Sequence, residues 1–76
     1  MLEKYKECFK ITLSLEDEQL VGLKYQDVES WDSVGHMILI STIEEKFEIM
    51  LEPDDIIDFS SFEKGQEILS KYNIVL

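Results

Sequence analysis

An amphipathic pattern over residues 33–47 most strongly limits how this chain can fold. Apolar side chains recur there at spacings of three and four, as they do on the buried face of a helix. The members of this stripe are His36, Leu39, Ile40, Ile43 and Phe47. Asp32 directly precedes the pattern, where a carboxylate caps the first turn and faces the positive end of the helix dipole. We therefore expect a helix over residues 33–47 with Asp32 as its N-cap.

Weaker signals predict a first helix and a long loop after it. Leu2, Tyr5, Cys8 and Phe9 recur at helical spacing, which indicates a helix that ends near Lys10 or a little beyond. Residues 14–30 have no sustained periodicity and contain Gly22. We expect an ordered loop there with a helical turn around residues 16–20. The apolar residues that would hold this loop against the core are Leu20, Leu23, Val28 and Trp31.

Two further helices are expected in the last third of the chain. Pro53 suits the first turn of a short helix over residues 53–59, PDDIIDF. Ser60 and Glu63 match a capping box, which predicts a last helix of about ten residues. Its buried side chains would be Phe62, Ile68, Leu69 and Tyr72, with Gly65 close to a neighbouring helix and Asn73 at the stop.

These elements predict an all-α fold, a small four-helix bundle formed by a single domain over residues 1–76. Hydrophobic residues make up 45% of the chain, which is enough for a core despite the high charge. No apolar run approaches the roughly 18 residues that span a membrane, and the charged beginning MLEKYKECFK does not resemble a secretory signal. With Cys8 as the only cysteine, these features favour a monomer in the cytoplasm.

The negative charge lies in one part of the chain. The net charge is -10, and residues 27–67 hold twelve acidic residues against Lys46 and Lys64. Such a field disfavours binding to nucleic acid or anionic membranes and favours partner proteins with basic patches. The acidic residues of EPDDIIDFSSFE lack the spacing of a calcium loop, so we expect no metal site and interpret them as surface and helix-end charges.

Ser33 is the candidate for a covalent modification. Asp32 already serves as the cap, so the adjacent hydroxyl is free of a structural task and would point away from the apolar stripe. Unpaired N–H groups at a helix start attract anions, so a phosphodiester on Ser33 would be favoured there. The spacing therefore suits a covalent modification at this residue.

The segment WDSVGHMILISTIEEKF, residues 31–47, resembles the phosphopantetheine attachment region of acyl carrier proteins. That region has Asp-Ser and an aliphatic residue, then an apolar helix that ends in an acidic pair and Phe. The resemblance extends over most of the chain, including the long loop and the short acidic helix at PDDIIDF. Val34, Gly35 and Ile38 depart from the pattern of carriers in primary fatty acid synthesis. The chain is therefore similar to a specialised, stand-alone member of the family.

The resemblance implies that Ser33 carries a covalent phosphopantetheine arm, which makes the protein a phosphoprotein, and that Asp32 supports its attachment. A phosphopantetheinyl transferase would install the arm. A ligase or transferase would then load an acyl or aminoacyl group as a thioester for use in biosynthesis. The chain would not be an enzyme and would contain no catalytic residue, since the chemistry belongs to the arm and to the partner enzymes.

The outer side of the same helix is the expected docking surface. Val34, Ile38, Ser41 and Glu45 share a face at spacings of four, three and four. Glu44 and Glu45 would steer loading and downstream enzymes through their basic docking patches. The alternative is that Met37 and Ile38 widen the buried stripe, and for Met37 the sequence favours neither reading.

Parts of the sequence also fit two functions other than that of a carrier. Asp32, Ser33 and His36 supply the residue types of a hydrolytic triad. All three lie at the same helix end, however, where the aspartate cannot reach the ring nitrogen of the histidine opposite the one that would face the serine. The stronger alternative is an acidic helical adaptor, an interaction module that has the carrier shape but is never modified.

Overall fold

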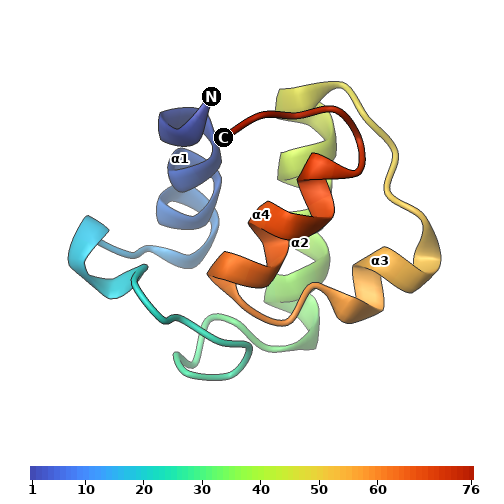
Figure 1. Cartoon of the computed structure of the whole chain (residues 1–76). Coiled ribbons are helices and arrows are strands. Elements are labelled where there is room, and N and C mark those ends of the chain that lie inside the picture. Colours follow the sequence, from blue (N-terminus) through green and yellow to red (C-terminus); the bar gives the residue numbers. More distant parts are fainter.

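The computed structural model describes residues 1–76, which form helices and loops without a strand (Figure 1). The α-helices in chain order are α1 (Leu2–Leu13), α2 (Ser33–Phe47), α3 (Pro53–Asp58) and α4 (Phe62–Ser70). One 3-10 turn, η1 (Asp17–Gln19), lies in the long loop between α1 and α2. The small all-α, four-helix fold predicted from the sequence is confirmed. None of the helices has the length and apolar surface that crossing a membrane requires.

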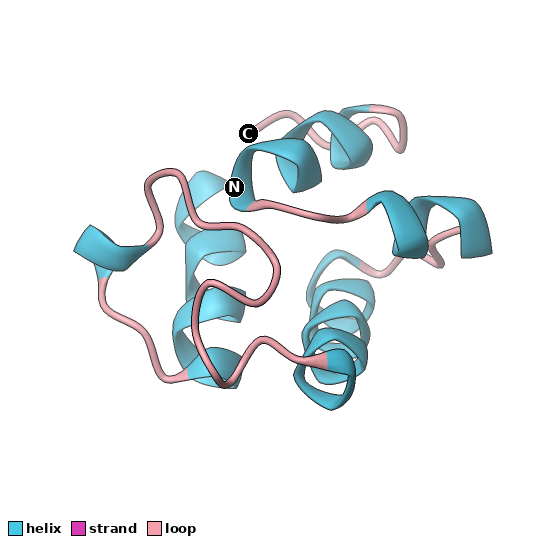
Figure 2. Cartoon of the chain, turned by 90° about the horizontal axis from the view of Figure 1, so that it is seen from below, coloured by secondary structure: helices cyan, strands magenta, loops and turns pink.

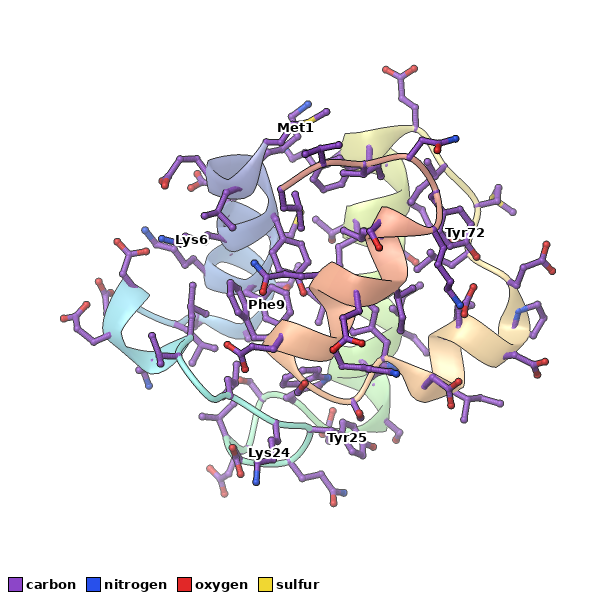
Figure 3. All side chains as sticks on the ribbon, in the orientation of Figure 1. Met1, Lys6, Phe9, Lys24, Tyr25 and Tyr72 are labelled. Carbon is purple, nitrogen blue, oxygen red and sulfur yellow. The ribbon has the colours of Figure 1, made fainter.

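A single cluster of 17 buried residues forms the core, with aromatic rings at its centre. The side chain of Phe9, a residue of α1, points toward α4 (Figure 3). Its ring centroid is 5.1 Å from that of Tyr5, 5.0 Å from that of Phe62 and 5.5 Å from that of Trp31. The Tyr5 hydroxyl donates a hydrogen bond of 2.6 Å to the main-chain oxygen of Phe62. Burial raises the pKa of the Tyr5 phenol, so this donor stays protonated. Packed aromatic rings therefore fill the space between α1 and α4.

The loop of residues 14–32 lies against the bundle as the sequence predicts. Leu20, Leu23 and Trp31 are buried, and Val28 is partly buried. Ser30 fixes the end of the loop, because its hydroxyl donates a hydrogen bond of 2.8 Å to the main-chain oxygen of Leu13. Figure 2 shows the loop running from α1 across the molecule into the first turn of α2. The loop thus delivers the start of α2 to a defined place on the surface.

The predicted capping box at the start of α4 is wrong by one residue. Ser61 is the N-cap, and its hydroxyl accepts a hydrogen bond of 2.9 Å from the Lys64 N–H. The main-chain oxygen of Ser60 instead accepts from the Tyr25 N–H at 2.9 Å, and the Phe62 N–H donates to the Leu23 oxygen. This pairing with the long loop keeps residues 60–61 extended, so the helix begins one residue later than local sequence suggests.

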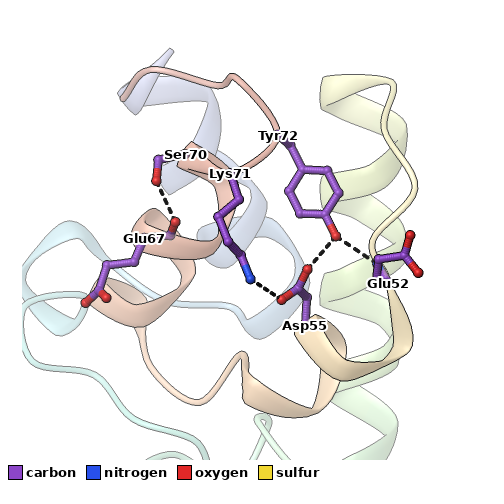
Figure 4. Close-up of polar contacts among 6 residues, drawn as sticks. All are labelled: Glu52, Asp55, Glu67, Ser70, Lys71 and Tyr72. Atoms are coloured by element: carbon purple, nitrogen blue, oxygen red, sulfur yellow. Dashed lines mark hydrogen bonds and ion pairs between the residues drawn. The ribbon is translucent and has the colours of Figure 1, made fainter.

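Asp55 is also not the surface charge that the sequence indicated. It is 8% exposed, and its two carboxylate oxygens accept hydrogen bonds from Lys71 Nζ at 2.5 Å and from the Tyr72 hydroxyl at 2.6 Å (Figure 4). The Tyr72 oxygen in turn accepts the Glu52 N–H at 2.9 Å. Tyr72 therefore lies beyond α4 and holds α3, instead of belonging to the buried face of α4. Asn73 follows with a φ of 65°, which ends the turn as expected.

The Asp55 cluster should stabilise the fold over a wide but bounded pH range. The hydrogen bonds from Lys71 and Tyr72 lower the pKa of Asp55. The same two hydrogen bonds raise the pKa of Lys71 and Tyr72. A lowered acid pKa gives stability that is present above the ordinary value of about 4 and is lost as pH falls through the folded-state value. The raised Lys71 pKa gives stability that is lost only when pH rises through its folded-state value, above its ordinary value of about 10.4.

We expect Asp55→Asn to lower the melting temperature at pH 7 by roughly 5 °C, because one anchoring charge is lost in a small domain. Thermal unfolding followed by circular dichroism at pH 7 and near pH 2 measures the change. The difference from the wild type should shrink as the pH falls, because protonation of Asp55 removes the charge that the asparagine lacks. Asp54→Asn is the matched control, since Asp54 is an exposed neighbour on α3. An equal effect of both substitutions would contradict the role of the cluster.

Replacing the residue that follows α2 by glycine should stabilise the protein. Glu48 has a φ of 55°, and its N–H donates to the Glu44 oxygen, so it closes the helix in the left-handed conformation. Glycine adopts this conformation without a steric cost. We expect Glu48→Gly to stabilise the protein by about 0.5–1 kcal/mol in urea unfolding. Ser14→Gly, at a φ of 58° after α1, is the uncharged comparison and should give a similar gain.

Candidate functional site

The start of α2 is held by Asp32. Its Oδ1 accepts a hydrogen bond of 2.8 Å from the Gly35 N–H, and its main-chain oxygen accepts one of 2.7 Å from the His36 N–H. The predicted N-cap is confirmed. Because Asp32 performs the capping, the side chain of Ser33 is not needed for it.

Ser33 is the first residue of α2, and its side chain is exposed. It contributes none of the side-chain hydrogen bonds of the chain, whereas the hydroxyls of Ser30 and Ser61 are both engaged with the main chain. The N–H groups of Ser33 and Val34 also have no partner within the helix, as at every helix start. The structure therefore presents a free hydroxyl beside unpaired N–H groups at the positive end of a helix dipole.

Gly35 explains how this turn can lie so close to the preceding loop. A Cβ at position 35 would lie 1.9 Å from the main-chain oxygen of Ser30. Ser30 and Trp31 are fixed in turn by a hydrogen bond to Leu13 and by complete burial of the indole. Glycine at this position thus allows the loop and the first turn of α2 to pack together, which sets the position of Ser33.

His36 joins this turn to α3. The indole N–H of Trp31 donates to His36 Nδ1 at 2.9 Å, so the ring proton is on Nε2, which donates to the Ile56 oxygen at 2.8 Å. The sequence predicted a partly buried histidine on the inner side, and the structure places it there. Both ring nitrogens are engaged, so His36 is not placed to take a proton from Ser33.

Exposed side chains gather along the outer side of α2, where they line a shallow hollow of about 510 Å³. This outer face of α2 consists of Ser33, Val34, Met37, Ile38, Ser41, Thr42 and Glu45. Val34 is 67% exposed, and Met37 and Ile38 are each 51% exposed. The structure therefore brings together Val34, Ile38 and the other residues predicted by helical spacing, and the buried-stripe alternative for Met37 and Ile38 does not hold.

Glu44 is the one predicted docking residue that lies apart from this face. It is partly buried, and its carboxylate accepts a hydrogen bond of 2.9 Å from the Leu51 N–H. Glu44 therefore holds the chain where it turns back after α2. Of the acidic pair, only Glu45 lines the outer face.

A second hollow, of about 350 Å³, lies on the other side of Ser33. Three segments form this inner hollow: the long loop, the first turns of α2, and α3 with the residue pair after it. The residues that line it are Tyr25, Ser33, His36, Met37, Ile56, Ile57 and Ser60. The sequence did not point to Tyr25, Ile56, Ile57 or Ser60 as site residues, because no local spacing links three such distant segments. Ser33 thus lines both hollows.

No protein-family model, curated protein or solved structure matches this chain.

Proposed function

We propose that this chain is a carrier protein that presents an acyl or aminoacyl group, held as a thioester on a phosphopantetheine arm attached to Ser33. The observation that carries the proposal is the exposed Ser33 hydroxyl, which makes no hydrogen bond in the fold and follows an aspartate that already caps the helix. The likeness of residues 31–47 to the attachment region of acyl carrier proteins supports the same assignment.

The residues at the start of α2 fit a phosphodiester. In the attachment step the Ser33 oxygen attacks the β-phosphorus of coenzyme A, the bond to the 3′,5′-adenosine bisphosphate group breaks, and the serine proton passes to the transferase or to water. The product places one negative charge beside the free N–H groups of Ser33 and Val34, where the helix dipole favours it. When bound, the arm supplies the thiol that carries the acyl group.

The remaining residues position the serine and present a surface. Gly35 and Trp31 hold the turn, and Asp32 fixes its start. The outer face of α2 would receive the partner enzymes, with Val34 and Ile38 as apolar anchors and Glu45 at the rim. The charge of -10 favours partners with basic patches, including the transferase and the loading ligase. We place the protein in the cytoplasm as a monomer that catalyses no reaction itself. The engagement of both His36 nitrogens in structural hydrogen bonds supports the last of these points, because it leaves no ring nitrogen free to activate Ser33.

Enzymatic labelling tests the proposal. A broad-specificity phosphopantetheinyl transferase is incubated with purified protein and coenzyme A that carries a fluorophore on its thiol. We expect one label on the wild type and none on Ser33→Ala. Ser70→Ala, at an exposed serine at the end of α4 and outside the outer face of α2, is the matched control and should be labelled. An unlabelled wild type beside a labelled known carrier would favour the unmodified acidic adaptor instead.

A further inference from the structure

We propose that His36 is a specificity-determining residue, which keeps the carried group outside the bundle and so restricts this carrier to short acyl or aminoacyl groups. The argument concerns the His36 bridge, the two hydrogen bonds that join Trp31, His36 and Ile56. The inference rests on the proposed function, because a limit on length has meaning only for a protein that is loaded. It names the class of group that the Ser33 site would present.

A long alkyl chain on the arm requires a place away from water. Each methylene that stays in water is unfavourable, so a carrier of long chains gains from apolar side chains that surround them. The two hollows that Ser33 lines are open at the surface, and neither includes a member of the buried core. The interior of the bundle is therefore the place that could enclose such a chain.

The interior is closely packed. Leu39 and Ile43, on the inner side of α2, have no exposed surface. Farther in, a Cβ added at Gly65 would lie 2.2 Å from the Tyr5 hydroxyl and 2.4 Å from the Phe59 ring. Even one methyl group finds no space there, so a chain of several methylenes could enter only if the helices separated.

The His36 bridge opposes such a separation at the end of the bundle where Ser33 lies. His36 follows Ser33 by one turn of α2, and its Nε2 donates to the main-chain oxygen of Ile56 in α3 at 2.8 Å. Its Nδ1 accepts the Trp31 indole N–H at 2.9 Å, and the planes of the two rings differ by 15°. The bridge thus ties the start of α2 both to α3, which lies beside it in Figure 1, and to the end of the long loop.

Opening the bridge would leave a buried polar group without a partner. Trp31 has no exposed surface, so its indole N–H would lose its hydrogen bond where water does not reach it. The His36 ring also packs edge-on against Tyr25 and Phe59, with 5.5 and 6.1 Å between centroids. A chain that entered here would break two hydrogen bonds and separate these rings. A short group that stays outside leaves all of these contacts in place.

Loading the protein with groups of two lengths tests the inference. A broad-specificity phosphopantetheinyl transferase attaches acetyl- or octanoyl-phosphopantetheine to Ser33 from the matching acyl coenzyme A. In the wild type we expect no nuclear Overhauser contact between the octanoyl chain and the methyl groups of Leu39 or Ile43. We also expect hydroxylamine to cleave both thioesters equally fast, once each rate is divided by that of the same thioester on free pantetheine.

His36→Ala removes the bridge and is expected to admit the octanoyl chain. Hydroxylamine should then cleave the octanoyl thioester about fivefold more slowly, because an enclosed state becomes populated, and the acetyl thioester at the unchanged rate. His36→Gln is the matched control, since its amide can accept from Trp31 and donate to Ile56, and it should behave as the wild type. If His36→Ala does not fold, Trp31→Phe replaces it, because it removes the indole donor and keeps an aromatic ring in the core.

The outcomes that contradict the inference differ from those that contradict the proposed function. Contacts from the octanoyl chain to Leu39 or Ile43 in the wild type would overturn the inference, and this measurement does not depend on any variant. A folded variant without the bridge whose octanoyl chain stays outside would overturn the role of His36. In both cases the proposed function would stand, because loading would have succeeded. Failure to load either group, beside a known carrier that accepts both, would overturn the proposed function instead.

Discussion

Gly35→Ala is expected to destabilise the protein strongly, with a loss of about 4 kcal/mol in the free energy of unfolding. A methyl group at this position would lie 1.9 Å from the main-chain oxygen of Ser30. Backbone cannot swing aside as a side-chain end can, and Ser30 is held by its bond to Leu13 and by the burial of Trp31. Stability of about 0.05–0.15 kcal/mol per residue amounts to roughly 4–11 kcal/mol for 76 residues, so the loss removes about a third of it or more.

Urea unfolding followed by circular dichroism measures this effect, with Gly22→Ala as the control. Gly22 has a φ of 71° but no atom within 4 Å of an added Cβ, so its substitution carries only the conformational cost, about 1 kcal/mol. A Gly35→Ala loss no greater than that of Gly22→Ala would show that the loop can retreat from α2. That result would also contradict the account of how Ser33 is positioned.

Gly65→Ala is expected to cost about 3 kcal/mol by a different route. The added Cβ would lie 2.2 Å from the Tyr5 hydroxyl and 2.4 Å from the tip of the Phe59 ring. The sequence predicted a close helix approach at Gly65, and Tyr5 of α1 is the neighbour. The Tyr5 hydroxyl would have to leave its hydrogen bond to Phe62, which strands a buried donor.

Two measurements separate this steric effect from a general loss of helix. Urea unfolding gives the change in stability, and near-ultraviolet circular dichroism reports the packing of the aromatic side chains, Tyr5 among them. Adding Tyr5→Phe to Gly65→Ala removes the clashing oxygen, so the double variant should lose less stability than the sum of the two single losses. Additive losses would mean that contact with Phe59 alone determines the cost.

Local sequence was sufficient to predict the bounds of a helix where the cap and the buried face lie within the helix and its flanking residues. The bounds of α2 agree with the predicted residues 33–47, because the Asp32 cap and the apolar stripe lie within one stretch of sequence. The start of α4 was wrong because the Ser60 oxygen bonds to Tyr25, a partner 35 positions away along the printed sequence. Asp55 was misjudged for the same reason, since its partners Lys71 and Tyr72 follow another helix.

The same division applies to the candidate site. Helical spacing identified Val34, Ile38, Ser41 and Glu45 as neighbours, and all four line the outer hollow beside Ser33. Spacing could not show that Glu44 would turn toward Leu51, because that contact depends on the course of the chain after α2. The inner hollow combines three distant segments, so no periodicity in one segment could reveal it.

The intact mass of the protein from cells that co-express a broad-specificity phosphopantetheinyl transferase tests the central claim most directly. The carrier account predicts a gain of one phosphopantetheine group, which fragmentation assigns to Ser33. An unmodified polypeptide, obtained while a known carrier domain in the same cells is fully converted, would contradict it.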